Sequence, residues 1–169
     1  MSSKSLAPLQ VFRFLVEFSQ VSIANDNPGS VVKICQGAFA ECTGLEATME
    51  AKVIKEGGRN YGAAQRAGQT TFATVVLKRG IGEADLWQVF NAVATGMFAP
   101  RLQVTITVFN PDETGTPKAV LAWQLTRAMP VKYKFADLNA RGTEIGIEEL
   151  HLAHEGLWST APTATLKEA

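Results

Sequence analysis

The chain has 169 residues, of which 46% are hydrophobic and 19% are charged, which is typical of a folded protein rather than a disordered one. Lys plus Arg and Asp plus Glu number 16 each, so the formal net charge is zero and no global basic field is available to hold nucleic acid. No apolar run reaches the roughly 20 residues that span a bilayer, so we expect no membrane insertion by the monomer.

The N-terminal segment favours synthesis in the cytoplasm without a secretory signal peptide. Arg13 and Glu17 interrupt its apolar stretch, which argues against a secretory signal. We predict one domain over residues 1–158, with a mobile arm at residues 1–10 and a flexible tail at residues 159–169.

The first strands are predicted from the alternation of apolar and polar residues. Residues 12–18 place large apolar side chains on one face, namely Phe12, Phe14, Val16 and Phe18. Short strands are predicted at residues 31–34 and 39–43. Residues 45–56 alternate again, with small or flexible apolar residues on one face: Ala47, Met49, Ala51 and Val53. A long polar loop is expected from Gly57 to about Gln69, because this segment has little apolar content.

Residues 70–93 predict a strand, a glycine turn and the one convincing helix of the chain. Apolar residues recur along the helix at spacings of three and four, and this stripe is expected to cover the core: Leu86, Val89, Phe90 and Val93. Glu83 and Asp85 suit the first helical turn, where the helix dipole favours negative charge. Gly96 suits the C-terminal cap.

The C-terminal half is predicted to be strands. Residues 103–109 present Val104, Ile106 and Val108 on one face and Gln103, Thr105 and Thr107 on the other. A second strand is expected over residues 119–129, ending before Pro130, and a third over residues 143–157, with a bulge near Glu148 and Glu149. About seven strands, one helix and no βαβ alternation predict an antiparallel β-sandwich or barrel with one flanking α-helix.

Few residues suggest chemistry. Gly80-Ile81-Gly82 precedes a helix as in a dinucleotide site, but Glu83 and Asp85 would repel a pyrophosphate. The odd separation of His151 and His154 sends them to opposite faces of a regular strand. Cys35 and Cys42 are too few for a disulfide framework or a metal site. We therefore expect no catalytic, cofactor-binding or metal-binding residues, and no enzyme activity.

Several segments together resemble the tail tube proteins of contractile phages and the inner tube proteins of phage-tail-like bacterial injection systems. They are FRFLVEF (12–18), FAECTGLE (39–46), EGGRN (56–60), LKRGI (77–81), DLW (85–87) and, within residues 123–158, AMPVKY and DLNARGTEIGIEELHLAHEGLW. The resemblance covers nearly the whole chain. It rests on the order and spacing of the segments, because none of them is decisive alone.

This resemblance implies a structural protein without catalytic residues or cofactors. Six copies would close into a ring with a continuous inner β-barrel, and stacked rings would form a hollow tube that a contractile sheath drives through a target envelope. The implied partners are other copies of the chain and the sheath, baseplate and terminator proteins, with cargo or DNA in the lumen. The protein would be made in the bacterial cytoplasm and assembled into a virion tail or an injection particle. Joining strand edges between copies would also remove unpaired edges.

Two groups of polar residues are candidate sites on this interpretation. The polar faces of two strands would line the lumen: Thr48, Glu50, Lys52, Gln103, Thr105 and Thr107. Ring stacking or subunit contacts would involve Lys55, Glu56, Arg59, Asn60, Tyr61, Lys78 and Arg79. The mixed charges from Glu50 to Arg59 also fit a solvated strand face or a direct contact with another copy.

Two alternatives to a tube subunit stay open at this point. One is a type VI-like secreted ring protein, whose fold is related, and the other is a monomeric small β-barrel binding module. The mass of the particle in solution distinguishes the binding module from a tube subunit, because a binding module stays a monomer and a tube protein forms hexamers or polymers.

Overall fold

The computed structural model describes residues 13–22, 32–81, 86–96, 100–111, 115–138, 140–141, 143 and 145–160. Its elements are β1 (Phe14–Ser22), β2 (Val32–Ala38), β3 (Glu41–Thr43), β4 (Ala47–Ile54), β5 (Ala64–Phe72), β6 (Val75–Gly80), α1 (Leu86–Ala94), β7 (Pro100–Pro111), β8 (Pro117–Lys134), β9 (Ile147–Ala153) and β10 (Gly156–Thr160). The predicted arm, Phe12, Glu83, Asp85 and residues 161–169 of the predicted tail lie outside the described residues.

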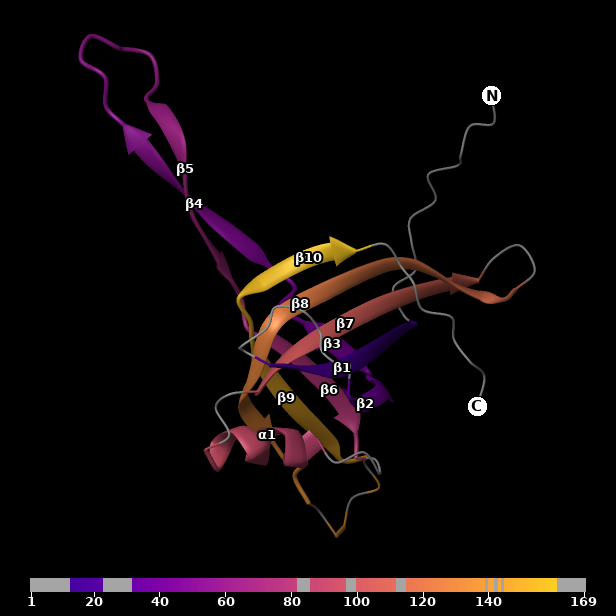
Figure 1. The fold of residues 1–169 in the computed structure, drawn as a ribbon. Coiled ribbons are helices and arrows are strands. Elements are labelled where there is room, and N and C mark those ends of the chain that lie inside the picture. The colour runs from indigo at the N-terminus through magenta and orange to yellow at the C-terminus, as the bar shows by residue number, and fades with distance from the viewer. Residues whose placement is uncertain are drawn as a thin grey trace.

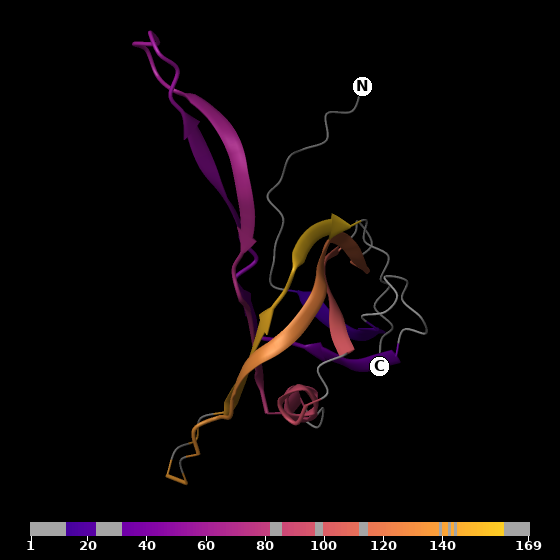
Figure 2. The same cartoon turned by 60° about the vertical axis from the view of Figure 1, so that its left-hand side comes forward.

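The body of the protein consists of two antiparallel sheets that share β8. The larger sheet has the order β2-β1-β7-β8-β10, and the smaller one has the order β8-β9-β6-β3. In Figures 1 and 2 the helix α1 lies against the end of this body that is remote from β4 and β5. The predicted mainly β, antiparallel fold with one flanking helix is confirmed.

The strand β8 changes sheets partway along its length. It is continuous over 18 residues, so the predicted end at Pro130 is wrong. Arg127 has a φ of 50°, and the register with β7 shifts beside it, between Leu125 and Ala128. Beyond this point β9 is the one described strand that pairs with β8, so β8 is an edge strand there, and its register with β9 shifts between Pro130 and Lys132. A proline, which has no N–H to donate, is tolerated at such an edge.

The core lies between the two sheets. The buried side chains of β1 and β7 include Val16, Phe18, Val104, Ile106 and Val108, which confirms the alternation predicted for these strands. The facing side chains of the smaller sheet are Val75, Leu77, Leu150 and Leu152.

The helix α1 closes this core, as the apolar stripe predicted. Leu86 is buried in the same cluster, and Val89 packs against it. Gly96 follows the helix with a φ of 107°, a conformation open to glycine, which confirms the predicted cap. Among the described residues no helix is long and apolar enough to cross a membrane.

The strands β4 and β5 form a separate two-stranded sheet that projects from the body (Figures 1 and 2). We call residues 47–72 the ribbon. All eight residues of β4 are exposed. The polar loop predicted from Gly57 to Gln69 is wrong in extent, because Ala64–Phe72 is a strand paired with β4 and residues 55–63 alone connect the two.

The strand predicted over residues 143–157 is in fact two strands. β9 ends at Ala153 and β10 begins at Gly156. The register between β6 and β9 is uninterrupted from Ile147 to Leu152, so the bulge predicted near Glu148 and Glu149 is wrong. The change of apolar phase arises because Ile147 lies on the exposed side of β9. Ser159 and Thr160, predicted to belong to the flexible tail, are in β10.

Gly44 fixes how the chain enters the ribbon. Its φ is +84°, and a methyl group at its Cα would overlap the carbonyl group of Thr74. Gly58, at the ribbon tip, has almost the same φ (+82°) but open space around it.

We predict that Gly58→Ala lowers the free energy of unfolding by the backbone cost alone, about 1–2 kcal/mol. Gly44→Ala is expected to cost about 1–3 kcal/mol more, because the added methyl is overpacked.

Denaturant unfolding of the two variants beside the unmodified chain measures this difference. Equal losses for Gly44→Ala and Gly58→Ala would show that the approach of Gly44 to Thr74 does not constrain the fold.

Candidate assembly surfaces

The larger sheet has a polar face that points away from the core. Glu17, Thr105 and Gln124 occupy one row across β1, β7 and β8. In the next row the Ser19 Oγ donates a hydrogen bond to the Gln103 carbonyl oxygen at 3.1 Å. Gln103 and Thr105, both predicted to line a lumen, therefore lie on a half-exposed face that is polar and sparsely charged.

Thr107 does not share the exposure of this face. It was predicted to face a lumen, but it is only 1% exposed. Its directly paired neighbours on the same face are Leu15 of β1 and Ala122 of β8. Because this end of the face is apolar and covered, Thr107 offers no surface to a lumen, and its assignment is corrected.

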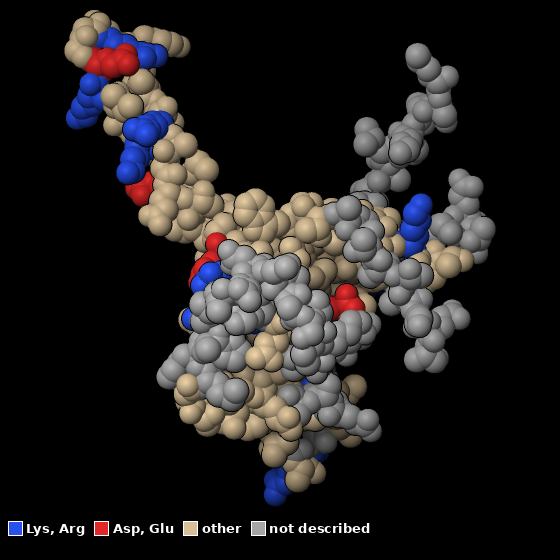
Figure 3. Space-filling model, in the orientation of Figure 1, with Lys and Arg blue, Asp and Glu red and all other residues tan. Residues whose placement is uncertain are grey.

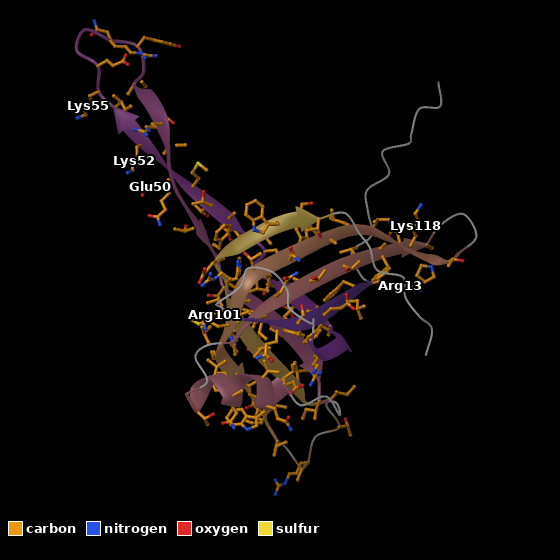
Figure 4. All side chains as sticks on the ribbon, viewed as in Figure 1. Arg13, Glu50, Lys52, Lys55, Arg101 and Lys118 are labelled. Carbon is orange, nitrogen blue, oxygen red and sulfur yellow. The ribbon has the colours of Figure 1, made fainter. Side chains whose placement is uncertain are left out.

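The other three residues predicted for the lumen lie elsewhere. Thr48, Glu50 and Lys52 are on β4, in the ribbon, where Figure 4 shows Glu50 and Lys52 far from the larger sheet. The structure thus separates the predicted lumen residues into two groups on different sheets. A lumen role for the β4 group stays a prediction.

The ribbon tip carries five of the seven residues predicted for subunit contacts. All five are exposed: Lys55, Glu56, Arg59, Asn60 and Tyr61. The Arg59 guanidinium pairs with the Glu56 carboxylate at 3.0 Å, but an exposed pair of this kind adds little stability. These side chains are therefore open to a partner.

The ribbon is a basic unit of a neutral chain (Figure 3). It holds four cations, Lys52, Lys55, Arg59 and Arg66, against two carboxylates, Glu50 and Glu56. Its formal charge is therefore +2, and the rest of the chain carries −2. Lys52 and Arg66 are directly opposite each other in the pairing of β4 with β5, an arrangement that is unfavourable without a nearby anion.

The last two residues predicted for subunit contacts, Lys78 and Arg79, differ in accessibility. The Lys78 Nζ lies 3.1 Å from the Glu41 carboxylate at the surface. Arg79 is only 6% exposed, because it has the same strand parity as the core residues Val75 and Leu77. The prediction of Arg79 as a contact residue is wrong.

Arg79 instead belongs to a buried polar cluster. Its Nε donates to the Glu148 Oε1, and the Tyr133 hydroxyl donates to the Oε2 of the same carboxylate. The guanidinium also lies 5.8 Å from the centre of the Phe39 ring. The cluster joins β6, β8 and β9, so it is a structural feature of the smaller sheet.

Figures 1 and 2 show that the connection from β8 to β9 lies at the end of the body opposite the ribbon, and the residues there and at the end of β6 include large exposed apolar side chains that sequence reasoning missed. We call this surface the apolar end patch; its residues are Ile81, Phe135, Leu138, Ile145 and Ile147. Leu138 is 92% exposed and Ile145 is 81% exposed. Gly146 lets this segment pack closely, because a methyl group there would lie 2.7 Å from the Ile81 Cδ1. Exposed apolar clusters of this kind mark contact sites.

The larger sheet also has two open edges. Among the described strands, β2 pairs with β1 alone and β10 pairs with β8 alone. Unpaired backbone N–H and C=O groups along such edges can pair with another chain.

The titratable residues singled out in the sequence, His151, His154 and Cys42, are half-buried in the body. The His151 Nε2 lies 3.5 Å from the Glu149 carboxylate, and the His154 Nδ1 lies 3.0 Å from the Gly156 carbonyl oxygen. Burial raises the pKa of the Cys42 thiol to about 11, so Cys42 is protonated at neutral pH and is a poor nucleophile. No cluster of three potential metal ligands occurs within the part of the chain that the structure describes.

The chain is similar to known proteins both in sequence and in fold. The family described as T4-like virus tail tube protein gp19 matches residues 10–158. A protein in the cryo-EM structure of the anti-feeding prophage (AFP) baseplate, 6-fold symmetrised, is 28% identical, with a TM-score of 0.67 over 95% of this chain and 97% of that one. No curated protein sequence matches the chain.

Two further solved structures share the fold. A protein of the sheath-tube complex of an extracellular contractile injection system, PVC, in the extended state is 19% identical, with a TM-score of 0.71 over 95% of this chain and 99% of that one. A protein in the structure of the anti-feeding prophage cap is 18% identical, with a TM-score of 0.71 over 95% of both chains.

The cluster around Glu148 allows a matched test of buried and exposed ion pairs. We predict that Glu148→Ala lowers the free energy of unfolding by about 3–5 kcal/mol, because it leaves the buried Arg79 charge without its carboxylate. Glu41→Ala, which breaks the surface pair with Lys78, is expected to cost less than about 1 kcal/mol. Thermal or denaturant unfolding measures the free energy of unfolding of both variants. Similar losses for Glu148→Ala and Glu41→Ala would show that the ion pair of Arg79 is not part of the structural core.

Proposed function

The chain belongs to the T4-like virus tail tube protein gp19 family, and we propose that six copies of it close into a ring and that the rings stack into a hollow tube. It is accordingly a structural subunit of the tube of a contractile phage tail or a phage-tail-like injection system. We further propose that sheath contraction drives this tube through a target envelope. The six-fold symmetry named for the AFP baseplate structure supports the number of copies.

The open edges of the larger sheet support ring closure. In a ring, β10 of one copy would lie beside β2 of the next, so that the larger sheets of all copies join into one barrel. Each seam would remove two unpaired edges. The single observation that carries the proposal is that, among the described strands, the larger sheet ends at both edges in a strand with one partner only.

The polar face of the larger sheet then lines the lumen. Its core face is already covered by the smaller sheet and α1, so the opposite face is the one left to point inward. Glu17, Gln103, Thr105 and Gln124 would present amide, hydroxyl and few charged groups to cargo or DNA. For Glu50 and Lys52, contact with another copy fits the projecting ribbon better than a place in the same barrel.

Stacking would use the two unlike ends of the subunit. The ribbon lies at one end and the apolar end patch at the other, so a ribbon can reach the next ring of the stack. The +2 formal charge of the ribbon and the −2 charge of the remaining chain favour such a contact electrostatically. The exposed contact residues Lys55, Arg59 and Tyr61 are at the ribbon tip.

Other components would act on the assembled tube. We propose sheath, baseplate and terminator proteins as its partners, and synthesis in the bacterial cytoplasm before assembly. The proposed role needs no catalysis, so we propose that the chain is not an enzyme.

Electron microscopy of the purified protein tests the assembly. We expect negative-stain images to show rings with a central hole and, at higher concentration, hollow rods. Light scattering on the same samples should give a mass of six chains or more. A monodisperse monomer at every concentration would contradict the proposal and favour a small β-barrel binding module.

Stacking can be separated from ring closure by variants of the apolar end patch. We predict that Leu138→Glu combined with Ile145→Glu leaves rings intact but abolishes rods, because two carboxylates would be buried between rings. Asn91→Glu, at an exposed position of α1 outside the patch, serves as the matched control and should form rods. Rods of normal length from the double variant would exclude the patch from stacking.

A further inference from the structure

We infer that Trp158, on the open edge strand β10, is the side chain that a neighbouring copy of this chain covers when the ring closes. Trp158 is 61% exposed, an unusual state for an indole ring in a free subunit. This inference rests on the proposed ring, and it adds the residue on which the contact between two copies depends.

The register of β10 puts Trp158 next to the place where a neighbour would join. Trp158 pairs with Gln124 of β8, whereas Leu157 pairs with the buried Leu125. Leu157 therefore packs toward the core, and Trp158 lies on the opposite, polar face. On its other side β10 has no partner among the described strands, so a strand added there would lie directly beside the indole.

The absence of a side chain at Gly156 leaves room for the indole. Gly156 is buried and lies two residues before Trp158, on the same face of the strand. A methyl group on Gly156 would lie 2.8 Å from the Trp158 Nε1 and 2.5 Å from the Thr126 Oγ1. The Thr126 hydroxyl and the indole together thus occupy the space that a side chain at position 156 would fill.

The edge of β10 that faces β8 is already hydrogen-bonded in the single subunit. The Glu155 amide donates to the Thr126 carbonyl oxygen at 3.0 Å, and the Glu155 carboxylate lies 2.9 Å from the Arg127 Nε. β10 then pairs with β8 from Gly156 to Thr160. A strand whose backbone is already fixed loses little conformational entropy when a partner binds, which favours the use of one of its side chains as an anchor residue.

The second copy is favoured over cargo as the partner of Trp158. Its indole is large and apolar, but the same row of this face continues with Gln124, Thr105 and Glu17, so among the described residues the row offers cargo no wider apolar surface. One exposed aromatic ring beside an unpaired backbone edge instead fits a strand partner, which supplies hydrogen bonds and a covering side chain together.

Fluorescence quenching tests whether the indole is covered. Trp87→Phe combined with Trp123→Phe leaves Trp158 as the sole tryptophan. We expect the acrylamide quenching constant to fall several-fold when rings form from monomers, as followed by light scattering on the same samples. An unchanged quenching constant in assembled rings would overturn the inference and leave Trp158 facing the lumen.

Two substitutions test whether the anchor is needed. Trp158→Ala is expected to raise the concentration for half-maximal ring formation on the order of 30-fold or more, as loss of a central interface tryptophan does. Gly156→Ala should act in the same direction, because it displaces the indole. Asn91→Ala, at an exposed position of α1 outside β10, the ribbon and the apolar end patch, is the control for both variants.

Far-ultraviolet circular dichroism and a thermal melt establish that each variant is folded before its assembly is compared. Normal ring formation by a folded Trp158→Ala variant would overturn the inference while leaving the proposed tube function intact. Absence of rings from the unmodified chain would instead contradict the proposed function.

Discussion

The architecture of the subunit depends on β8 being hydrogen-bonded in both sheets. Its first part holds β7 on one side and β10 on the other, and its last part holds β9. The turn of the backbone near Arg127 separates these two roles. β10 pairs with β8 alone among the described strands and is therefore an edge of the larger sheet, while the later part of β8 belongs to the facing sheet, so that the two sheets enclose one core. The surfaces proposed for ring closure and for the lumen both follow from this strand.

Elements that bury one face could be predicted from the sequence, and elements without a buried face could not. The alternation in β1 and β7 and the stripe of α1 reflect burial on one side, as the complete burial of Val16 and Val104 illustrates. β5 has no such face: its sequence AQRAGQTTF is polar and contains Gly68, so the sequence predicts a loop over most of its length. Its order in the structure comes from pairing with β4, a long-range effect that leaves no periodic signal. The end of a strand predicted at Pro130 is wrong for a related reason. Whether a strand can contain a proline depends on which strands pair with it, and the sequence does not show the partners of β8.

The candidate surfaces were predictable where exposure follows from strand parity alone. Gln103 and Thr105 met that condition. Arg79 shares the strand parity of the buried Val75 and Leu77, but burial of a charged side chain depends on a partner, and its partner Glu148 is 69 residues away in the chain. Thr107 is covered through the neighbours Leu15 and Ala122 on other strands. The apolar end patch was missed because Ile145 and Leu138 are apolar, and composition alone cannot distinguish an apolar contact surface from a core.

The ribbon has no core of its own, and two-stranded sheets are marginally stable in water. In the proposed tube each ribbon would gain its rigidity from the ring that it touches, so ordering of the ribbon and growth of the stack would be one cooperative event. A protease would then cleave free subunits at residues 55–63 but spare the shaft of the tube. The ring at the terminus that presents its ribbons to solvent would stay the weakest part of the polymer. A terminal protein that covers these ribbons would therefore set the length of the tube by ending its growth, and would also protect it from degradation.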